Sequence, residues 1–229
     1  MSAMCHTASA FVARLLAGGG MYSDMQNTTT KVLVIALLAT IGLTWLDLAT
    51  KDWALESLSV EREHNKPPLC ERAADGYIHI QRLRTAPIVL IDGYLEFRYA
   101  ENCGAAFGML HDAPEWIRST LFTVAALVAT GVLGFFFVSG RGGPLFAWAV
   151  PLVVSGALGN LIDRFRYGYV VDFIRFHLQN GWEWPTFNVA DITISIGVGL
   201  MLLDSFLQPK PVRHVETASE PQQPPTSTV

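Results

Sequence analysis

Long hydrophobic stretches without charged residues recur along this chain. Residues 119–140 and 142–162 contain no Asp, Glu, Lys or Arg, and each approaches the roughly 20 residues that an α-helix needs to cross a bilayer. Two shorter uncharged runs, 32–46 and 192–203, become long enough if one polar end of each enters the membrane interface. The pattern predicts four transmembrane helices, at about 32–53, 119–140, 142–162 and 187–207.

The connection between the first two predicted helices is polar enough to lie outside the bilayer. Residues 77–83 alternate between apolar and polar side chains, and the apolar segments 88–91 and 94–100 flank the dipeptide Asp92-Gly93. An Asp-Gly pair between two such segments is typical of a β-hairpin turn. We therefore expect a small antiparallel β-sheet domain at about 58–111.

The two ends of the chain have a different composition. Residues 1–30 are mixed and rich in Gly, and residues 208–229 are rich in Pro, Gln, Ser and Thr. Such segments bury too little apolar surface to fold, so we predict a disordered leader and a disordered tail around one membrane domain at 31–207. The run 31–44 also resembles a cleaved signal peptide, but no small-x-small cleavage pattern follows closely.

Composition agrees with a membrane protein. Hydrophobic residues make up 51% of the 229 residues, charged residues make up 16%, and the mean hydropathy is +0.32. Soluble domains typically carry about 25% charged residues. The expected fold class is therefore an all-α membrane protein with four transmembrane helices and a small antiparallel β-sheet domain.

Polar residues gather where consecutive predicted helices meet the same side of the membrane. A chain that crosses four times brings the end of its first and third helices and the start of its second and fourth to one surface. An ionisable group at such a place costs about 2.5–3.5 kcal/mol in the bilayer and suggests a functional site. The residues on this side are Asp47, Lys51, Asn102, Gly104, Asn160, Asp163, Arg164, Asp172, Asn188 and Asp191.

The charge distribution leaves the orientation open. Of the 16 Lys and Arg residues, all but Arg14, Lys31, Arg141, Lys210 and Arg213 fall on the side of the polar residues. Counted naively, the positive-inside rule would place that side in the cytoplasm. The rule weakens for long connections such as the one between the first two helices, so composition alone does not decide.

Asp172 and Asp191 are candidates for a catalytic pair. Two neighbouring carboxyls cannot both ionise cheaply, so they share one proton and titrate as a pair. The ionised member can then take a proton from water while the protonated member polarises a carbonyl. Asp191 lies near the start of a predicted helix, whose positive end favours the charged form, so we expect Asp191 to be the more readily ionised.

Simpler interpretations exist for several of these residues. The neighbours Asp163 and Arg164 could form an interfacial ion pair, and Asp47 with Lys51 could fasten one helix end as an i, i+4 pair. The carboxyls could also line the path of a small proton- or cation-coupled transporter. Such a path needs polar residues through the whole bilayer, whereas here they lie at one end.

Other chemistries find little support in the residues. The histidines and cysteines lack metal-ligand spacing, so we expect no metal or other cofactor, and we expect no nucleic acid as partner. A thiol nucleophile at Cys103 has no supporting residues nearby, so Cys103→Ala should retain most activity. Cys70 and Cys103 lie on the same side and could pair in an oxidising compartment.

Five ordered blocks of sequence carry a resemblance to a known family. They are D-L-A-T-K at 47–51, E-N-C-G-A-A-F at 101–107, G-N-L-I-D-R at 159–164, V-V-D-F at 170–173 and F-N-V-A-D at 187–191. In order and spacing the chain resembles the bacterial lipoprotein signal peptidases (signal peptidase II) over roughly residues 30–207. That family comprises aspartyl proteases of the inner membrane.

The resemblance implies a function and a site. Asp172 and Asp191 would be the catalytic pair, on the periplasmic side, with both termini in the cytoplasm. The substrate would be a prolipoprotein whose cysteine carries diacylglycerol, cleaved just before that cysteine, and membrane lipids would surround the enzyme. The other polar residues of that side would support the site. Phe107, Met109 and Leu110 form an apolar run with no other obvious burial, so we expect them to be a lid or wall near the acyl chains.

Two departures from the family pattern are visible. The loop at 58–90 is longer than we expect for the family, which bears on substrate access. Cys103 stands between the motif residues Asn102 and Gly104, where other polar residues are more familiar.

Overall fold

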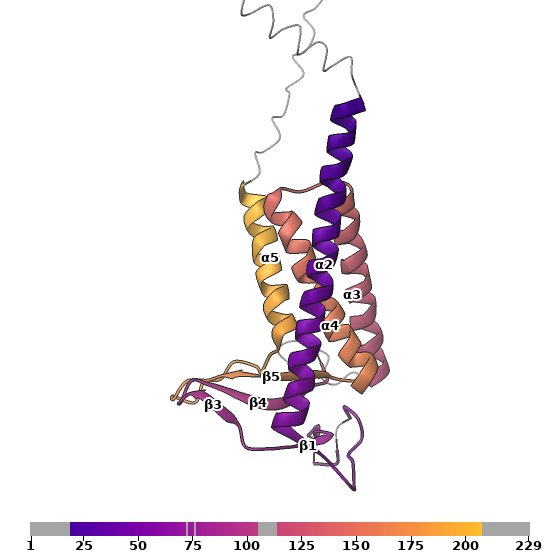
Figure 1. Cartoon of the computed structure of the whole chain (residues 1–229). Helices are drawn as coiled ribbons and strands as arrows, with labels where there is room; N and C mark the ends of the chain where they lie inside the picture. Colours follow the sequence, from indigo (N-terminus) through magenta and orange to yellow (C-terminus); the bar gives the residue numbers. More distant parts are fainter. Residues whose placement is uncertain (1–18, 72, 76, 105–113, 208–229) are drawn as a thin grey trace, which may run out of the picture.

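Four long helices form a bundle that is capped at one end by β-structure (Figure 1). The structure, a computed structural model, describes residues 19–71, 73–75, 77–104 and 114–207. All four helices are long and apolar enough to span a membrane, which confirms the predicted count. They are α2 (Gly19–Leu58), α3 (Glu115–Val138), α4 (Pro144–Tyr167) and α5 (Val189–Leu207).

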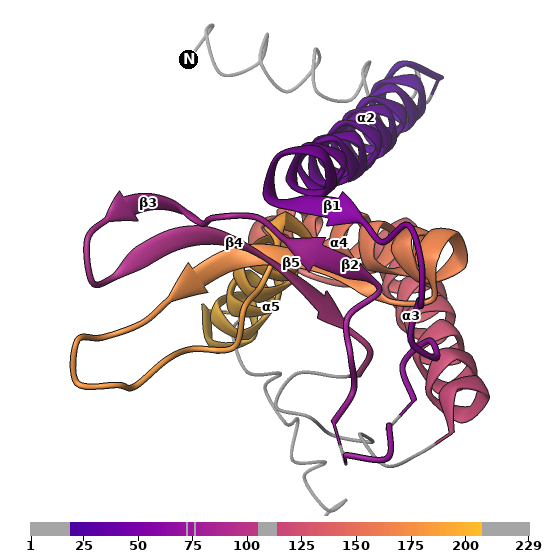
Figure 2. The ribbon, with the colours of Figure 1, turned by 90° about the horizontal axis from the view of Figure 1, so that it is seen from below.

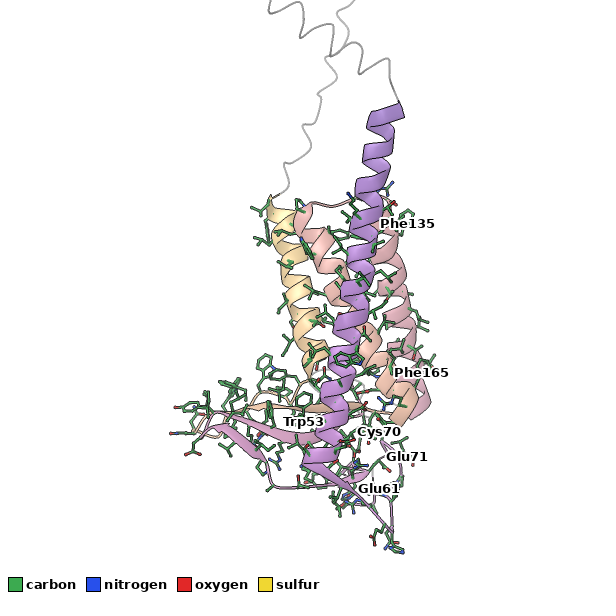
Figure 3. All side chains as sticks on the ribbon, in the orientation of Figure 1. Trp53, Glu61, Cys70, Glu71, Phe135 and Phe165 are labelled. Atoms are coloured by element: carbon green, nitrogen blue, oxygen red, sulfur yellow. A yellow bond between two sulfur atoms is a disulfide. The ribbon has the colours of Figure 1, made fainter. Side chains whose placement is uncertain are left out.

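The outer surface of the bundle is apolar. Leu38 on α2, Phe135 on α3 and Leu202 on α5 are 63%, 60% and 58% exposed. In Figure 3, Phe135 lies on α3 near the end of the bundle opposite the sheet. Contiguous apolar surface of this kind marks contact with lipid rather than with water.

Several helix boundaries differ from those predicted, among them the start of α2 and the end of α4. α2 begins at Gly19, inside the segment 1–30 that the sequence predicted to be disordered. No Pro or Gly follows Gly20 before residue 42, so nothing in this stretch breaks the helix. α4 continues past the charge-free run to Tyr167, because Asp163 is buried and Arg164 half-buried in a network described below. Residues 1–18 and the predicted tail at 208–229 lie outside the described residues.

The main sheet has three antiparallel strands in the order β3-β4-β5. β3 (Ile88–Ile91) and β4 (Leu95–Asn102) form the predicted hairpin, with Gly93 at φ 73° in its turn, a conformation that glycine adopts without strain. β5 (Val170–Phe176) pairs with β4 and places Asp172 opposite Ala100. In Figure 2, seen from below, β4 and β5 lie side by side beneath the helices.

Two features of the β-structure were not predicted correctly. The expected strand at 77–83 is mostly irregular, and only β2 (Arg82–Arg84) forms there, paired with β1 (Ser59–Glu61). β5 was not predicted as a strand at all. β5 pairs with β4 although about 70 residues separate the paired positions in the sequence, so no local pattern indicates the pairing.

A buried cluster fastens the sheet to the end of α2. Tyr99, Val171 and Phe173 pack with Ala54 and Leu58 of α2. The rings of Trp53, Phe97 and Phe173 meet edge to face. Burial of each large side chain contributes about 1.5–3 kcal/mol, so this cluster holds β4 and β5 in a fixed position under the bundle.

At the opposite end, Asp204 joins α5 to α4. Its carboxylate accepts hydrogen bonds from the backbone N–H of Gly143 at 2.8 Å and of Leu145 at 3.2 Å. Gly143 is the N-cap of α4 and Leu145 lies in its first turn, so neither N–H has a partner within the helix. A carboxylate at a helix N-terminus is also favoured by the helix dipole.

Candidate active site

A cleft of about 880 Å³ opens at the end of the bundle that carries the sheet. All ten predicted site residues lie at this end, which agrees with the one-sided arrangement expected from the sequence. Six of them line the cleft, namely Asn102, Gly104, Asn160, Arg164, Asp172 and Asp191. The other four, Asp47, Lys51, Asp163 and Asn188, are buried.

Asp172 is a buried carboxyl held by two amides. It lies on β5 and is 2% exposed. Asn102 donates to its Oδ2 at 3.0 Å, and Asn188 donates to its Oδ1 at 2.7 Å. Burial raises the pKa of Asp172 well above the ordinary range, and the charge of Asp191 raises it further, although the two amide donors oppose the shift. The site therefore favours a proton on Asp172.

Asp191 is the more accessible carboxyl, in the first turn of α5. It accepts hydrogen bonds from Asn160 Nδ2 at 3.0 Å and from the backbone N–H of Asn188 at 3.2 Å. In return its own N–H donates to Asn188 Oδ1 at 3.0 Å. This reciprocal arrangement resembles a capping box, and the helix dipole favours negative charge there.

Asn188 connects the two carboxyls. Its side chain donates to Asp172 Oδ1 and to Asn160 Oδ1, while its own Oδ1 accepts from the backbone of Asp191. It is fully buried. One amide thus fixes both members of the pair relative to each other.

Lys51 is the centre of a buried cluster of charged side chains, next to the segments that carry Asp172 and Asp191. Its Nζ lies 2.8 Å from Asp47 Oδ2 and 3.3 Å from Asp163 Oδ2, and it donates to Asn160 Oδ1 at 2.8 Å. Because Asn160 Oδ1 accepts from Lys51 and Asn188, its Nδ2 is directed to Asp191. The ammonium group of Lys51 therefore fixes the orientation of the Asn160 amide, so that its Nδ2 and not its Oδ1 meets the Asp191 carboxylate.

The two carboxylates bound to Lys51 each hold the residue before a candidate catalytic aspartate. Asp47 accepts from the N–H of Ala190 at 2.8 Å, and Asp163 accepts from the N–H of Val171 at 3.0 Å. Lys51 is thereby linked to the backbone of both segments that carry the pair. Asp47 and Lys51 do more than pair at one helix end, since Lys51 contacts Asn160 and Asp163 of α4 and Asp47 contacts Ala190 of α5.

Arg164 does not form the ion pair with Asp163 that the sequence allowed, so that interpretation is wrong. Its guanidinium donates to the backbone carbonyl of Asn160 at 3.1 Å and of Gly104 at 3.5 Å. It also lies over the ring of Phe122, 4.8 Å from the centroid, a favourable cation–π geometry. Arg164 therefore joins α4 to the end of β4 and to α3.

Several contributors to the site were not identified from the sequence. A Cβ atom on Gly159 would clash with Asp47 Oδ2, so glycine lets α2 and α4 approach closely there. Glu101 of β4 accepts hydrogen bonds from the N–H groups of Gln81 and Arg82 at 2.7 and 2.9 Å. These bonds join the long loop at 58–90 to β4. A glycine beside Asn160 inside a helical run was a signal that could have been read as close packing.

The long loop at 58–90 contributes part of the lining of the cleft. Ile78, His79 and Ile80 line it, together with Phe122 of α3 and Ile194 of α5. The cleft is thus lined by the polar residues of the site, by apolar residues of two membrane spans and by residues 78–80 of the long loop. The predicted lid residues Phe107, Met109 and Leu110 lie outside the described residues.

Cys70 and Cys103 form a disulfide, with Cα atoms 5.5 Å apart. The sequence left this pairing open. A disulfide-bonded Cys103 has no thiol to act as nucleophile, so that alternative is contradicted.

Truncation of Asn188 is expected to lower both stability and rate. Asn188→Ala removes donors from a buried carboxyl and an acceptor from α5, and each unsatisfied buried group costs about 1–3 kcal/mol. Arg164→Ala should have a smaller effect in the same direction. Asn180→Ala is a matched control, since Asn180 is exposed and bonds only its own loop. Thermal melting and kcat should change in the first two variants only, and unchanged values in both would remove these residues from the site.

Comparison with known proteins gives a consistent match. The sequence profile of the family described as signal peptidase (SPase) II matches residues 37–207. A lipoprotein signal peptidase of Psychromonas ingrahamii is 37% identical over 178 residues, which cover 76% of this chain and 91% of the relative. One of Chromobacterium violaceum is 43% identical over 120 residues, 52% of this chain and 74% of the relative.

Solved structures match as well. One is described as a bacterial membrane enzyme structure by the in meso method at 1.9 Å resolution. It is 25% identical, with a TM-score of 0.56, and the match covers 77% of this chain and 94% of that one.

Proposed function

Because the chain belongs to the signal peptidase II family, we propose that it processes prolipoproteins as an aspartic endopeptidase, with Asp172 and Asp191 as its catalytic pair. The family membership makes it a membrane-embedded protease that removes signal peptides from prolipoproteins. A role as a small transporter receives no support from the relatives.

One observation carries the assignment of the pair. Asn188 bonds Asp172 through its side chain and Asp191 through both its backbone and its side chain, and both carboxyls line one cleft. Two carboxyls held in a fixed relation to each other in one cleft suit acid–base catalysis, in which one group gives a proton and the other takes one.

The different environments of the two carboxyls give them different roles, one as base and the other as acid. Asp191, at the positive end of α5, is the base that takes a proton from water, and the resulting hydroxide attacks the scissile carbonyl. Asp172, whose pKa burial raises, holds the shared proton, polarises that carbonyl and stabilises the tetrahedral intermediate. The proton taken from water then passes to the leaving nitrogen as the C–N bond breaks. Water is the nucleophile, so no acyl-enzyme forms.

Arg164 and Asn160 can orient the peptide. Both line the cleft, and Arg164 supplies a fixed positive charge beside the carboxyls. Its contact with the carbonyl of Gly104 is long, at 3.5 Å, so a substrate carbonyl can take that place. An oriented donor in a water-poor site stabilises developing negative charge.

The proposed location is the bacterial inner membrane, with the cleft and the sheet on the periplasmic side and both termini in the cytoplasm. The disulfide at the cleft supports this orientation, because disulfides persist in the oxidising periplasm and are rare in the cytosol. The excess of Lys and Arg on the same side lies mostly in a long connection and in the site, where the positive-inside rule has little force.

The proposed substrate carries diacylglycerol on the cysteine that follows the scissile bond. Phe122 of α3 and Ile194 of α5 line the cleft from the membrane side, so acyl chains can lie against the spans while the peptide reaches Asp172 and Asp191.

The test is cleavage of a diacylglyceryl-modified prolipoprotein by the purified protein in detergent. Mass spectrometry should identify a product whose first residue is the lipidated cysteine. Cleavage at any other bond, or no cleavage by folded protein, would contradict the proposed function.

A further inference from the structure

The disulfide lies one residue from the proposed catalytic machinery. Cys103 directly follows Asn102, the residue that donates to Asp172 Oδ2 at 3.0 Å. Asn102 also accepts from the N–H of Gly104 at 3.1 Å. The cross-link therefore attaches at the centre of a short turn whose amide side chain holds a catalytic carboxyl.

Among the described residues, few contacts other than the disulfide hold the backbone from Asn102 to Gly104. In the part of the chain that the structure describes, the pairing of β4 with β5 ends at the pair Asn102 and Val170. Beyond it, Gly104 contacts Arg164 through a long interaction of 3.5 Å. A strand end without ladder bonds opens more easily than the strand interior, so the orientation of Asn102 depends on what holds the turn.

Cys70 provides a firm anchor for that turn. It is 3% exposed and belongs to the buried cluster that contains Tyr99 and Tyr169. Its Sγ lies 3.8 Å from the carbonyl of Gly168, the residue that ends α4. The disulfide thus ties the end of β4 to the buried cluster, and Cys70 is in van der Waals contact with the end of the helix that carries Asn160 and Arg164. Figure 3 shows Cys70 at the end of the bundle that carries the sheet.

We propose that the Cys70–Cys103 disulfide is a positioning element of the peptidase, which holds Asn102 in place to orient Asp172. The enzyme therefore reaches its full rate only after the disulfide has formed. This inference rests on the proposed role of Asp172. It also revises the expectation, made from the sequence alone, that a variant without Cys103 retains most activity.

Loss of the disulfide should act on kcat more than on KM. A misplaced donor weakens an interaction with the reacting groups, and small displacements of such groups cost large factors in rate. The acyl chains bind elsewhere, against the spans. We expect kcat to fall roughly tenfold and KM for the lipidated substrate to stay within about twofold.

The first measurement uses the purified full chain in detergent, with and without a dithiol reductant. Reduction adds two electrons and two protons to the disulfide, giving thiols on Cys70 and Cys103, while the reductant becomes a disulfide. Cys70→Ser and Cys103→Ser should reproduce the loss without reductant and should not respond to it. Cys5→Ser is the matched control. It should keep the wild-type rate and the response to reductant.

A double-mutant cycle separates positioning from general stabilisation. If the disulfide acts through Asn102, its loss in an Asn102→Ala background should add less than about twofold to the defect of Asn102→Ala alone. Assays are run well below the melting temperature of each variant. If a serine variant does not fold, reduced wild-type protein and reduced Asn102→Ala protein complete the same cycle.

The outcomes are distinct from a failure of the proposed function. If oxidised wild-type protein cleaves the substrate but reduction lowers only the melting temperature, the disulfide is structural and the inference is wrong. Equal losses from reduction in wild-type and Asn102→Ala backgrounds would also contradict it. If Asp172→Asn remains active, the proposed function itself fails, whatever the disulfide does.

Discussion

Asparagine in place of either Asp172 or Asp191 is expected to abolish turnover, lowering kcat by roughly 10²–10⁴-fold. Each substitution keeps the size of the side chain but removes half of an acid–base pair. Asp172→Asn also places an amide N–H₂ against the donors Asn102 and Asn188, so some loss of stability accompanies the loss of rate. Cleavage of a lipidated prolipoprotein and thermal melting should be measured on the same preparations.

Asp204→Asn is the matched control for this pair of variants. Asp204 likewise accepts two hydrogen bonds, in its case from backbone N–H groups, but it lies at the opposite end of the helices from the cleft. The variant should lose stability to a similar degree, about 1–3 kcal/mol at most, and keep its rate below the melting temperature. Near-normal activity in either Asp172→Asn or Asp191→Asn would overturn the assignment of the catalytic pair.

Removal of diacylglycerol from the substrate is expected to lower kcat/KM by at least roughly 10²-fold. Each methylene that leaves water contributes about 0.8 kcal/mol, and two acyl chains also confine the substrate to the membrane that holds the enzyme. The apolar lining from Phe122 and Ile194 lies beside the polar base of the cleft. Lipid and scissile bond can therefore be bound together, which orients the peptide for attack.

The comparison requires peptides of identical sequence, with and without the lipid, at equal concentration and in the same detergent. A peptide with one acyl chain should show an intermediate kcat/KM. Equal cleavage of the lipidated and unlipidated peptides would mean that the enzyme reads peptide sequence alone, and the proposed binding of the acyl chains would be wrong.

Helix count and the side of the polar residues could be predicted because both follow from local composition. Uncharged runs of about 20 residues are a direct consequence of bilayer thickness. The Asp92-Gly93 hairpin is likewise encoded in neighbouring residues. The start of α2 was missed, because a disordered composition was assigned to residues 19–30 although nothing there interrupts a helix.

The internal design of the site could not be predicted in the same way. The bonds from Asp47 to Ala190 and from Asp163 to Val171 join residues of separate elements. They depend on where α2 crosses α4 and on the pairing of β5 with β4, which no local periodicity encodes. Cys70 and Cys103 were equally ambiguous, since sequence shows two cysteines on one side but not whether their Cα atoms come within bonding range.

Whether Asp172 and Asp191 share one proton is tested most directly by kcat/KM for the lipidated substrate as a function of pH. At low pH both carboxyls are protonated and the base is lost, so the rate should fall. At high pH both are ionised and the acid is lost. Because burial raises the pKa of Asp172, the shared proton is kept above the ordinary carboxyl range, and the alkaline fall should begin only there. A bell-shaped profile is the predicted result, whereas a rate that rises to a plateau with no alkaline fall, in enzyme shown to remain folded, would contradict a shared proton.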